Sequence, residues 1–444
     1  MDFTPHTPAD VERMLATLGL ASCADLFSHL PQAVRLRRPL DLPGPLAEAE
    51  VMKRLEALAG RNRADLVCFA GGGIYDHYLP PVVRALTMRP EFVTSYTPYQ
   101  SEVSQGVLQA LFEYQSMVAA ITGLPVANAS LYDGATAALE AANLAVGATG
   151  RRGLWVSRGL APQARRVLAT FARARGLELV EHALADGRTA WDSSAAPEPA
   201  VVMFAQPNYL GIVEDYDAAV GLARSTGALA AASVDPMLLG VLRSPGAAGC
   251  DIAFGEGQPL GSPLSFGGPG LGIMATSAAL MRRIPGRLVG RTHDELGRIG
   301  YTLTLRTREQ DIRREKASSN ICTNEGLNAL AAAVHLAWLG PEGLAETGRQ
   351  SVQRAHYLEE RLRPARGVRL AVGAPFAREF PLLLPVDPQR VIRAMAERGY
   401  LAGIDLSADY PELPNALLVA VTEQRSREEM DGYAAALAEA VADA

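Results

Sequence analysis

Residues 251–276 read DIAFGEGQPLGSPLSFGGPGLGIMAT, and this stretch decides the fold class. Asp251–Phe254 and Leu271–Ala275 are short apolar runs of the kind that form buried strands. The loop between them holds glycines at 255, 257, 261, 267, 268 and 270. Glycine lets a backbone turn sharply and approach a ligand or a second chain closely. The stretch therefore predicts a strand, a loop that faces a ligand or a partner, and a second strand.

This layout resembles the cofactor-lysine region of the aminotransferase-like enzymes that use pyridoxal 5'-phosphate (PLP). In those enzymes a lysine follows the first strand and holds PLP as a Schiff base. The matching position here is Gln258, whose amide is not basic and cannot form an imine with an aldehyde. Lys53 and Lys316 are the only two lysines, and both are far from this loop in the sequence. The sequence therefore predicts a PLP-type fold without its lysine.

Composition places the chain among globular α/β proteins. Its 444 residues suffice for two lobes, and 48% hydrophobic with 20% charged residues is ordinary for this class. A net charge of −6, without a basic run that carries aromatics, argues against nucleic-acid binding. The acidic N-terminus and the lack of a long apolar run indicate neither secretion nor a membrane span. Four cysteines without CxxC spacing and seven scattered histidines favour a cytoplasmic protein with reduced thiols and no metal site.

The sequence predicts three parts. Residues 1–60 are expected to form a helical arm, 61–324 a large α/β domain, and 325–444 a small α+β domain. An arm that is poor in strands is more typical of docking than of forming its own core. Its expected helices cover 7–18, 22–30 and 47–58, with Thr7 or Asp10 capping the first and Ser22 the second.

From residue 124 onward, expected strands and helices alternate, which predicts a mostly parallel sheet covered on both faces. Sites in such sheets lie at the carboxyl ends of the strands. Asp133-Gly134, Asn208, Asp235 and Gln258 all follow expected strands. The strands are expected at 124–129, 154–157, 177–181, 200–206, 229–234, 251–254 and 271–275, and the helices at 131–146, 162–175 and 216–226.

Two loops ahead of the sheet are candidate binding segments. The glycine loop 69–73 fits a tight turn and a site loop equally well. Residues 96–106 carry two tyrosines, two glutamines, a glutamate and two serines just before a helix expected over 103–122. So many hydrogen-bonding groups favour a binding surface over a plain helix cap.

An arginine-rich run follows the sheet, from residue 280 to 316, and such a run is typically a solvated helix face. It leads into SSNICTN (318–324), a polar turn that is expected to cap the next helix. The expected elements of the small domain are helices at 325–339, 344–362, 391–398 and 427–441, and strands at 368–384, 403–404 and 417–421.

Taken together, the motifs resemble the family of glycine dehydrogenase (decarboxylating) subunit 1, the N-terminal half of the P protein of the glycine cleavage system. The ordered set covers almost the whole chain, which makes the resemblance specific. The matching runs are DFTPHT (2–7), FAGGG (69–73), SYTPYQSEVSQGVLQALFEYQ (95–115), ANASLYDGATA (127–137), GEGQPLGSP (255–263), FGGPGLG (266–272), PGRLVG (285–290) and TLRTREQDIRREKASSNICTN (304–324).

The resemblance implies the PLP-dependent transferase fold of type I and a role in glycine decarboxylation. The P protein binds glycine as an imine on PLP, releases CO2 and passes the aminomethyl group to the lipoyl arm of the H protein. In the split form PLP and its lysine belong to subunit 2, so no cofactor is expected on this chain. Glutamine at 258 is what subunit 1 should show. The implied partners are subunit 2, with two copies of each subunit, the lipoylated H protein and glycine.

Two aspartates of a PLP-type pocket are present. The resemblance puts Asp235 where an aspartate pairs with the pyridinium nitrogen of PLP, and here it is either a relic or a structural hydrogen-bond acceptor. The helix start at Asp133-Gly134 could hold a phosphate through backbone N–H groups. The carboxylate of Asp133 would repel that phosphate, which argues against a working PLP pocket.

The resemblance implies an active site between two subunits, so loops of this chain could complete the site of subunit 2. Tyrosine hydroxyls and arginine suit a carboxylate or a phosphate. We expect the tyrosine loop to line the glycine or lipoyl channel and the SSNICTN turn to approach the phosphate. The alternative is that these residues only pack an interface. The candidates are Tyr96, Tyr99, Gln100, Glu102, Ser104, Arg308, Lys316, Asn320 and Thr323.

Two alternatives stay open at this point. A self-sufficient PLP enzyme would need Lys316 in a pocket near Asp235, whereas its Arg-Arg-Glu-Lys setting indicates an exposed side chain. A purely structural subunit would stabilise its catalytic partner without contributing to the site.

Overall fold

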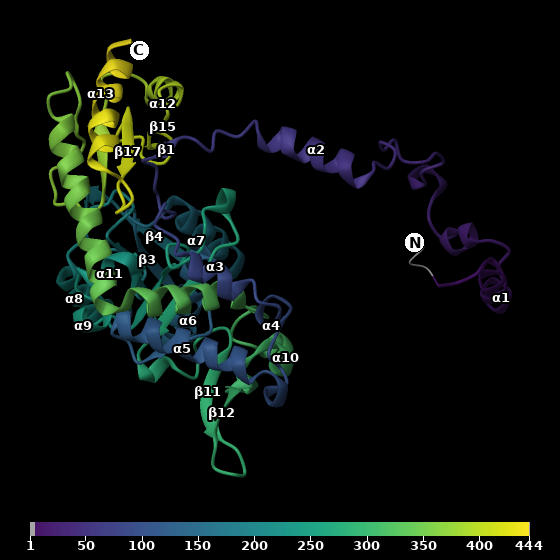
Figure 1. Ribbon diagram of the computed structural model, residues 1–444. Coiled ribbons are helices and arrows are strands. Elements are labelled where there is room, and N and C mark those ends of the chain that lie inside the picture. Colours follow the sequence, from purple (N-terminus) through teal and green to yellow (C-terminus); the bar gives the residue numbers. More distant parts are fainter. Residues whose placement is uncertain (1–4, 444) are drawn as a thin grey trace. The chain divides into compact units, whose positions relative to one another are not determined.

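The computed structural model describes residues 5–443, which separate into two compact units with a boundary between Ala64 and Asp65 (Figure 1). Residues 1–4 of the expected arm, including the start of the DFTPHT motif, and the last residue of the expected small domain lie outside the described range. No helix within that range is long and apolar enough to cross a membrane.

The first unit is a series of exposed helices. Thr7 caps the first through Asp10 N–H, and Asp10 in turn accepts from Thr7 N–H, which forms a capping box as the sequence predicts. The second expected helix is only a short 3-10 turn that ends at Phe27. The described residues of this unit are exposed or half-buried throughout, so its apolar side chains find no core within it. Its elements are α1 (Pro8–Leu18), the 3-10 helices Cys23–Phe27 and Gln32–Val34, and α2 (Glu48–Ala59).

The second unit is built on a seven-stranded sheet. Its five central and edge strands β9, β8, β7, β3 and β4 run parallel, and β10 runs antiparallel between β9 and β2. This confirms the mostly parallel sheet of the type I fold. In spatial order the strands are β2 (Val126–Ala127), β10 (Gly272–Thr276), β9 (Ile252–Glu256), β8 (Leu229–Val234), β7 (Pro199–Gln206), β3 (Gly153–Ser157) and β4 (Glu178–His182).

Both faces of the sheet are buried because alternate residues of a strand point to opposite sides. Val201 and Met203 of β7 belong to the core under α6 and α7, whereas Val202 and Phe204 belong to the core under α5 and α8. Five alanines of α6 are fully buried, which lets that helix lie close to the sheet: Ala137, Ala138, Ala141, Ala142 and Ala145. The helices are α5 (Gln105–Thr122), α6 (Gly134–Thr149), α7 (Pro162–Arg175), α8 (Tyr216–Thr226) and α9 (Pro245–Ala248), preceded by β1 (Val67–Cys68), α3 (Pro81–Thr87) and α4 (Pro90–Val93).

A third core forms around the C-terminal strands and helices, which Figure 1 shows grouped together. The long helix α11 is kinked at Gly340, the residue before Pro341, where φ is 61°. Strand β1 pairs with β15, so the start of this unit joins the C-terminal region. The division at residue 324 stays a prediction. The elements are α11 (Gly326–Leu362), α12 (Pro388–Glu397), α13 (Arg427–Asp443), the antiparallel sheet β13 (Arg369–Leu370), β14 (Glu379–Leu383), β17 (Ala416–Ala420) and β16 (Ile404–Asp405), and β15 (Tyr400–Leu401).

The prediction of a solvated helix for the arginine-rich run was wrong. Strands β11 (Leu288–His293) and β12 (Ile299–Thr304) form a hairpin whose turn is fixed by Asp294, which accepts from Leu296 N–H and Arg298 N–H. β-Branched residues favour strands, and Gln105 of α5 pairs with the backbone of β12. Figure 1 shows the hairpin extending away from α5. The only helical pieces of the run are short: α10 (Gln310–Arg313) and the 3-10 helices Ala278–Leu280, Arg306–Arg308 and Arg314–Lys316.

The cap predicted from SSNICTN was also wrong. The N-cap of α11 is Glu325, and its side chain makes no capping hydrogen bond. The turn instead docks on the sheet, where Asn324 donates to Ala129 O over 3.1 Å. The remaining short pieces are the hairpin β5 (Leu184–Ala185) with β6 (Arg188–Thr189) and the 3-10 helices Ser101–Val103, Pro236–Gly240 and Ser265–Gly267.

Candidate functional site

A cavity of about 600 Å³ opens at the carboxyl ends of the parallel strands, and we call it the central cavity. The four sequence positions expected at strand ends all line it: Asp133-Gly134, Asn208, Asp235 and Gln258. Gly72 and Gly73 line it as well, so the glycine loop after β1 belongs to this site. A Cβ on Gly71 would lie 2.4 Å from Glu379 Oε1, which only glycine avoids.

Both the oxygen and the nitrogen of the Gln258 side-chain amide make hydrogen bonds. Its Oε1 accepts from Tyr75 N–H over 3.0 Å, and its Nε2 donates to Ser262 O over 2.8 Å. The side chain is 4% exposed and therefore fixed in this orientation. At the position of the cofactor lysine, the chain has a neutral clamp that ties the glycine loop to β9. The chemistry of an amine is absent from this position.

The helix start next to Gln258 is occupied by a carboxylate. Glu256 Oε2 accepts from Gly134 N–H over 2.9 Å, and Oε1 accepts from Gln258 N–H and from Leu271 N–H, each over 2.8 Å. Burial raises the pKa of Glu256, while these three backbone donors oppose the rise. Asp133 caps the same helix through Thr136 N–H over 2.7 Å. Two of the backbone donors at this helix start, Gly134 N–H and Thr136 N–H, are thus already used.

Asp235 is a structural acceptor. It forms an ion pair with Arg378 and accepts from Met237 N–H over 3.1 Å. Arg378 is 1% exposed, and its guanidinium carbon lies 3.6 Å from the centre of the Tyr75 ring. The carboxylate of Asp235 is therefore already paired with a cation of the same chain. Of the two roles left open for this aspartate, the geometry supports the structural one.

A buried glutamate completes this cluster. Glu379 accepts from Gly72 N–H over 2.7 Å and from Tyr75 O–H over 2.9 Å. Burial raises the pKa of Glu379 to about 7, against the hydrogen bonds and the charge of Arg378. The group holds the glycine loop against β14.

The residues of the central cavity do not fit a covalently held PLP. The lysine position carries Gln258, the first amide of α6 donates to Glu256, and Asp235 is paired with Arg378. No step of a PLP reaction is therefore assigned to this cavity.

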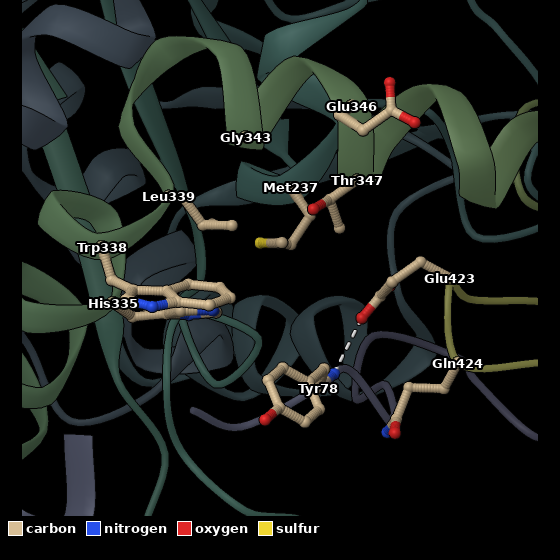
Figure 2. A pocket seen from close by; sticks show the side chains of 10 residues that line it. All are labelled: Tyr78, Met237, His335, Trp338, Leu339, Gly343, Glu346, Thr347, Glu423 and Gln424. Atoms are coloured by element: carbon tan, nitrogen blue, oxygen red, sulfur yellow. Dashed lines mark hydrogen bonds between the residues drawn. The ribbon is translucent and has the colours of Figure 1, made fainter. Parts of the chain in front are cut away.

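A second cavity of about 510 Å³ lies beside the kink of α11 (Figure 2). His335 is buried and stacked on Trp338, and burial lowers the pKa of His335 to about 4. Figure 2 shows Glu423 accepting from Tyr78 N–H, over 2.8 Å. His77 contacts both Glu423 and Arg378 and so links this cavity to the cluster around Asp235.

The predicted tyrosine loop is open to solvent. Tyr96 is 85% exposed and Tyr99 is 49% exposed, and Gln100 and Glu102 are exposed as well. Ser104 is half-buried at the start of α5 and accepts Leu108 N–H through its backbone. The loop thus presents phenol and carboxylate groups outward, next to α5.

Arg287, which sequence reasoning did not single out, joins this loop to the SSNICTN turn. It is 2% exposed and donates to Tyr99 Oη over 3.1 Å, to Cys322 O over 2.8 Å and to Thr323 Oγ1 over 3.4 Å. Its guanidinium carbon also lies 5.1 Å from the Tyr99 ring centre. Tyr99 and Thr323 are therefore brought together through one arginine, and the PGRLVG motif was the only sequence signal for it.

The other candidates of the turn region differ in role. Arg308 points inward, donating to Ile284 O and, over 2.7 Å, to Gly286 O, and burial lowers the pKa of Arg308. Arg308 therefore stabilises the fold of its own chain. Lys316 and Asn320 are exposed. Lys316 does not line the central cavity, so the pocket near Asp235 that a self-sufficient enzyme would need does not form around it.

Comparisons with known proteins agree with this geometry. A family model described as glycine cleavage system P-protein matches residues 1–437. The chain is 51% identical to the probable glycine dehydrogenase (decarboxylating) subunit 1 of Moorella thermoacetica, over 98% of this chain and 99% of that protein. It is 47% identical to the protein of the same name in Prosthecochloris aestuarii, over 98% of each chain.

Solved structures give the same result. A crystal structure of glycine decarboxylase (P-protein) of the glycine cleavage system, in inhibitor-bound form, is 48% identical with a TM-score of 0.89, over 99% of this chain and 100% of that one. A sphingosine-1-phosphate lyase of Burkholderia pseudomallei, at 16% identity and a TM-score of 0.65 over 93% of this chain and 95% of that one, shares the fold alone. The fold is that of the PLP-dependent enzymes of type I, as expected from residues 251–276. The chain belongs to the P-protein family of the glycine cleavage system and, within it, to subunit 1 of glycine dehydrogenase (decarboxylating).

Proposed function

We propose that this chain is the subunit of glycine dehydrogenase (decarboxylating) that carries no PLP and works only together with a PLP-bearing subunit 2. The pair decarboxylates glycine, releases CO2 and transfers the aminomethyl group to the lipoyl arm of the H protein. The observation that supports this most directly is Gln258, whose amide is hydrogen-bonded at both ends where a lysine would be required.

The contribution of this chain to the partner's site is assigned to the loop and the turn that Arg287 joins. Tyr96, Tyr99 and Glu102 present hydrogen-bonding groups to solvent, and Asn320 lies exposed in the adjoining turn. Phenol and amide groups on a rigidly anchored loop suit the positioning of a small carboxylate substrate. In this proposal the tyrosine loop borders the glycine or lipoyl channel of subunit 2.

The assembly is proposed to contain two copies of each subunit and to receive the lipoylated H protein. We place it in the cytoplasm, because Cys23, Cys68, Cys250 and Cys322 are all free thiols, as in a reducing compartment.

The test is reconstitution of the pair. This chain and a PLP-bearing subunit 2 are purified separately, and CO2 release from carboxyl-labelled glycine is measured in the presence of lipoylated H protein. Neither subunit alone should turn over glycine, and the mixture should. Full activity of subunit 2 alone, at an equal concentration of folded protein, would mean that this chain is only a scaffold.

A matched pair of variants separates a site contribution from mere assembly. Tyr99→Phe removes the hydroxyl that accepts from Arg287, whereas Tyr78→Phe changes a tyrosine that is also 49% exposed but lines the second cavity. Tyr99→Phe should lower kcat or raise KM for glycine without weakening the complex, and Tyr78→Phe should not. Equal rates for both variants and the unchanged pair would reject the proposed role of the loop.

A further inference from the structure

Three backbone amides from three separate segments converge on one side chain in the central cavity. Gly134 N–H comes from the start of α6, Gln258 N–H from the residues after β9, and Leu271 N–H from just before β10. All three donate to Glu256, over 2.8 to 2.9 Å. Charge-assisted contacts of this length to backbone N–H groups are strong. The arrangement is a preformed anion site that is filled by the chain itself.

The anion site also leaves little room for a free anion. A Cβ on Gly134 would lie 3.0 Å from Glu256 N, so the first turn of α6 packs directly against the backbone of β9. Gly270 is equally close, because a Cβ there would lie 3.0 Å from Glu256 Oε2. A phosphate could use these amides only by displacing the carboxylate. The carboxylate is covalently tethered, so its effective concentration at the site is on the order of millimolar or above.

Asp235, which lines the same cavity, is paired with a cation that does not itself line it. Arg378 pairs with Asp235 and lies flat against the Tyr75 ring, with 3.6 Å between the guanidinium carbon and the ring centre. Stacking of a planar guanidinium on an aromatic face is favourable, and it is most so when water is excluded. The three amides around Glu256 and the carboxylate of Asp235 are thus both bound by side chains of the same chain.

We propose that Glu256 is a resident anion that occupies the phosphate position of the cavity. Together with Arg378 on Asp235, it excludes a phosphate-bearing coenzyme independently of the residue at 258. The proposal extends beyond the missing lysine, because it states that an amine restored at 258 would still not make this chain a PLP protein. It concerns this chain alone, so it can fail while the paired function holds, and the reverse is equally possible.

The first test measures anion binding to the separate chain. Inorganic phosphate and formate are titrated into Glu256→Ala and into the unchanged chain, and binding is followed by calorimetry and by the shift in Tm. Glu256→Ala should bind both anions at least about tenfold more tightly than the unchanged chain, because the three amides become available. Glu325→Ala, which removes another carboxylate of the same cavity, serves as the control and should gain no anion affinity. Equal affinity of the unchanged chain and Glu256→Ala would overturn the proposal.

The second test adds the amine. Gln258→Lys and the double variant Gln258→Lys with Glu256→Ala are incubated with PLP, reduced with borohydride to fix any imine, and analysed by mass. The double variant should take up at least about tenfold more PLP than the single one. Equal uptake by the two variants, including none by either, contradicts the proposal.

A third measurement covers the case in which Glu256→Ala does not fold. Glu256→Gln keeps the volume of the side chain but has one accepting oxygen, so it cannot accept from Gly134 N–H on one side and from Gln258 N–H and Leu271 N–H on the other. Hydrogen exchange should then become at least about tenfold faster at Gly134, or at Gln258 and Leu271, than in the unchanged chain, while exchange in the core of β8 stays as it was. Unchanged exchange at all three amides would mean that the carboxylate does not hold them.

Discussion

Replacing Arg287 with methionine should disconnect the tyrosine loop from the SSNICTN turn. The guanidinium is buried and donates to Tyr99 Oη over 3.1 Å and to Cys322 O over 2.8 Å, with further contacts to Thr97, Thr323 and Asn324. Methionine keeps most of the apolar stem and removes all donors, so the carbonyl of Cys322 loses its partner in a part-buried contact.

The expected cost follows from these contacts. Removing the buried guanidinium from these part-buried acceptors costs about 3 kcal/mol, which is less than the sum of the separate contacts because such contributions do not add fully. At about 2.1 cal/mol/K per residue, the unfolding entropy of a 444-residue chain is about 0.9 kcal/mol/K, so Tm should fall by about 3 °C. Misplacing a substrate-positioning loop by about 1 Å can cost about a hundredfold in rate, so CO2 release by the pair should fall well beyond the loss of folded protein.

The assay compares Arg287→Met with Arg291→Met, which changes an exposed arginine of the same strand β11. Tm is read by circular dichroism, and glycine turnover is measured with subunit 2 at a temperature where both variants are fully folded. Arg291→Met should stay within about 0.5 kcal/mol of the unchanged chain. An Arg287→Met pair with unchanged turnover and unchanged Tm would refute the anchoring role of this arginine.

Three further outcomes concern the backbone and the buried titratable groups. Gly340→Ala should lower the free energy of unfolding by about 1–2 kcal/mol because φ there is 61°. Gly221→Ala, within α8 and equally free of close neighbours, should raise it by about 0.5–1 kcal/mol. Both changes are measured by urea unfolding. Glu379, with a pKa near 7 when folded and about 4.3 when unfolded, should lose stability as pH rises between these values. Glu379→Gln should flatten that part of the profile of unfolding free energy against pH. His335, with a pKa of about 4 when folded, should lose stability as pH falls from about 6.5 to 4, and His335→Gln should remove this loss in the same profile.

The spacing of apolar residues and the helix-capping residues predicted the central strands and their covering helices well. The helices 162–175 and 216–226 and the strand 229–234 have the bounds that their apolar spacing and flanking glycines indicate. These segments are buried on a regular period, so local pattern and tertiary environment agree. The consequence of glutamine at 258 could also be predicted from the sequence, because an amide cannot replace an amine in imine formation.

The features of the fold and of the site that could not be predicted from the sequence depend on contacts between residues far apart in the chain. The arginine-rich run forms a hairpin because β12 packs on α5, and charge density alone does not report that contact. Arg287 has the sequence setting of a surface cation, yet it is buried and binds two distant segments of the chain, 97–99 and 322–324. The role of Glu256 needed the approach of the α6 start to the end of β9, which only the folded chain shows.

The location of the cofactor in the assembled pair offers the most direct measurement. The complex of this chain with subunit 2 is reduced with borohydride in the presence of PLP, the subunits are separated, and each is analysed by mass for a covalent pyridoxyl group. Only subunit 2 should carry the group, on a lysine, while this chain keeps its unmodified mass. A pyridoxyl group on this chain, together with glycine turnover by this chain alone, would contradict the division of labour between the two subunits.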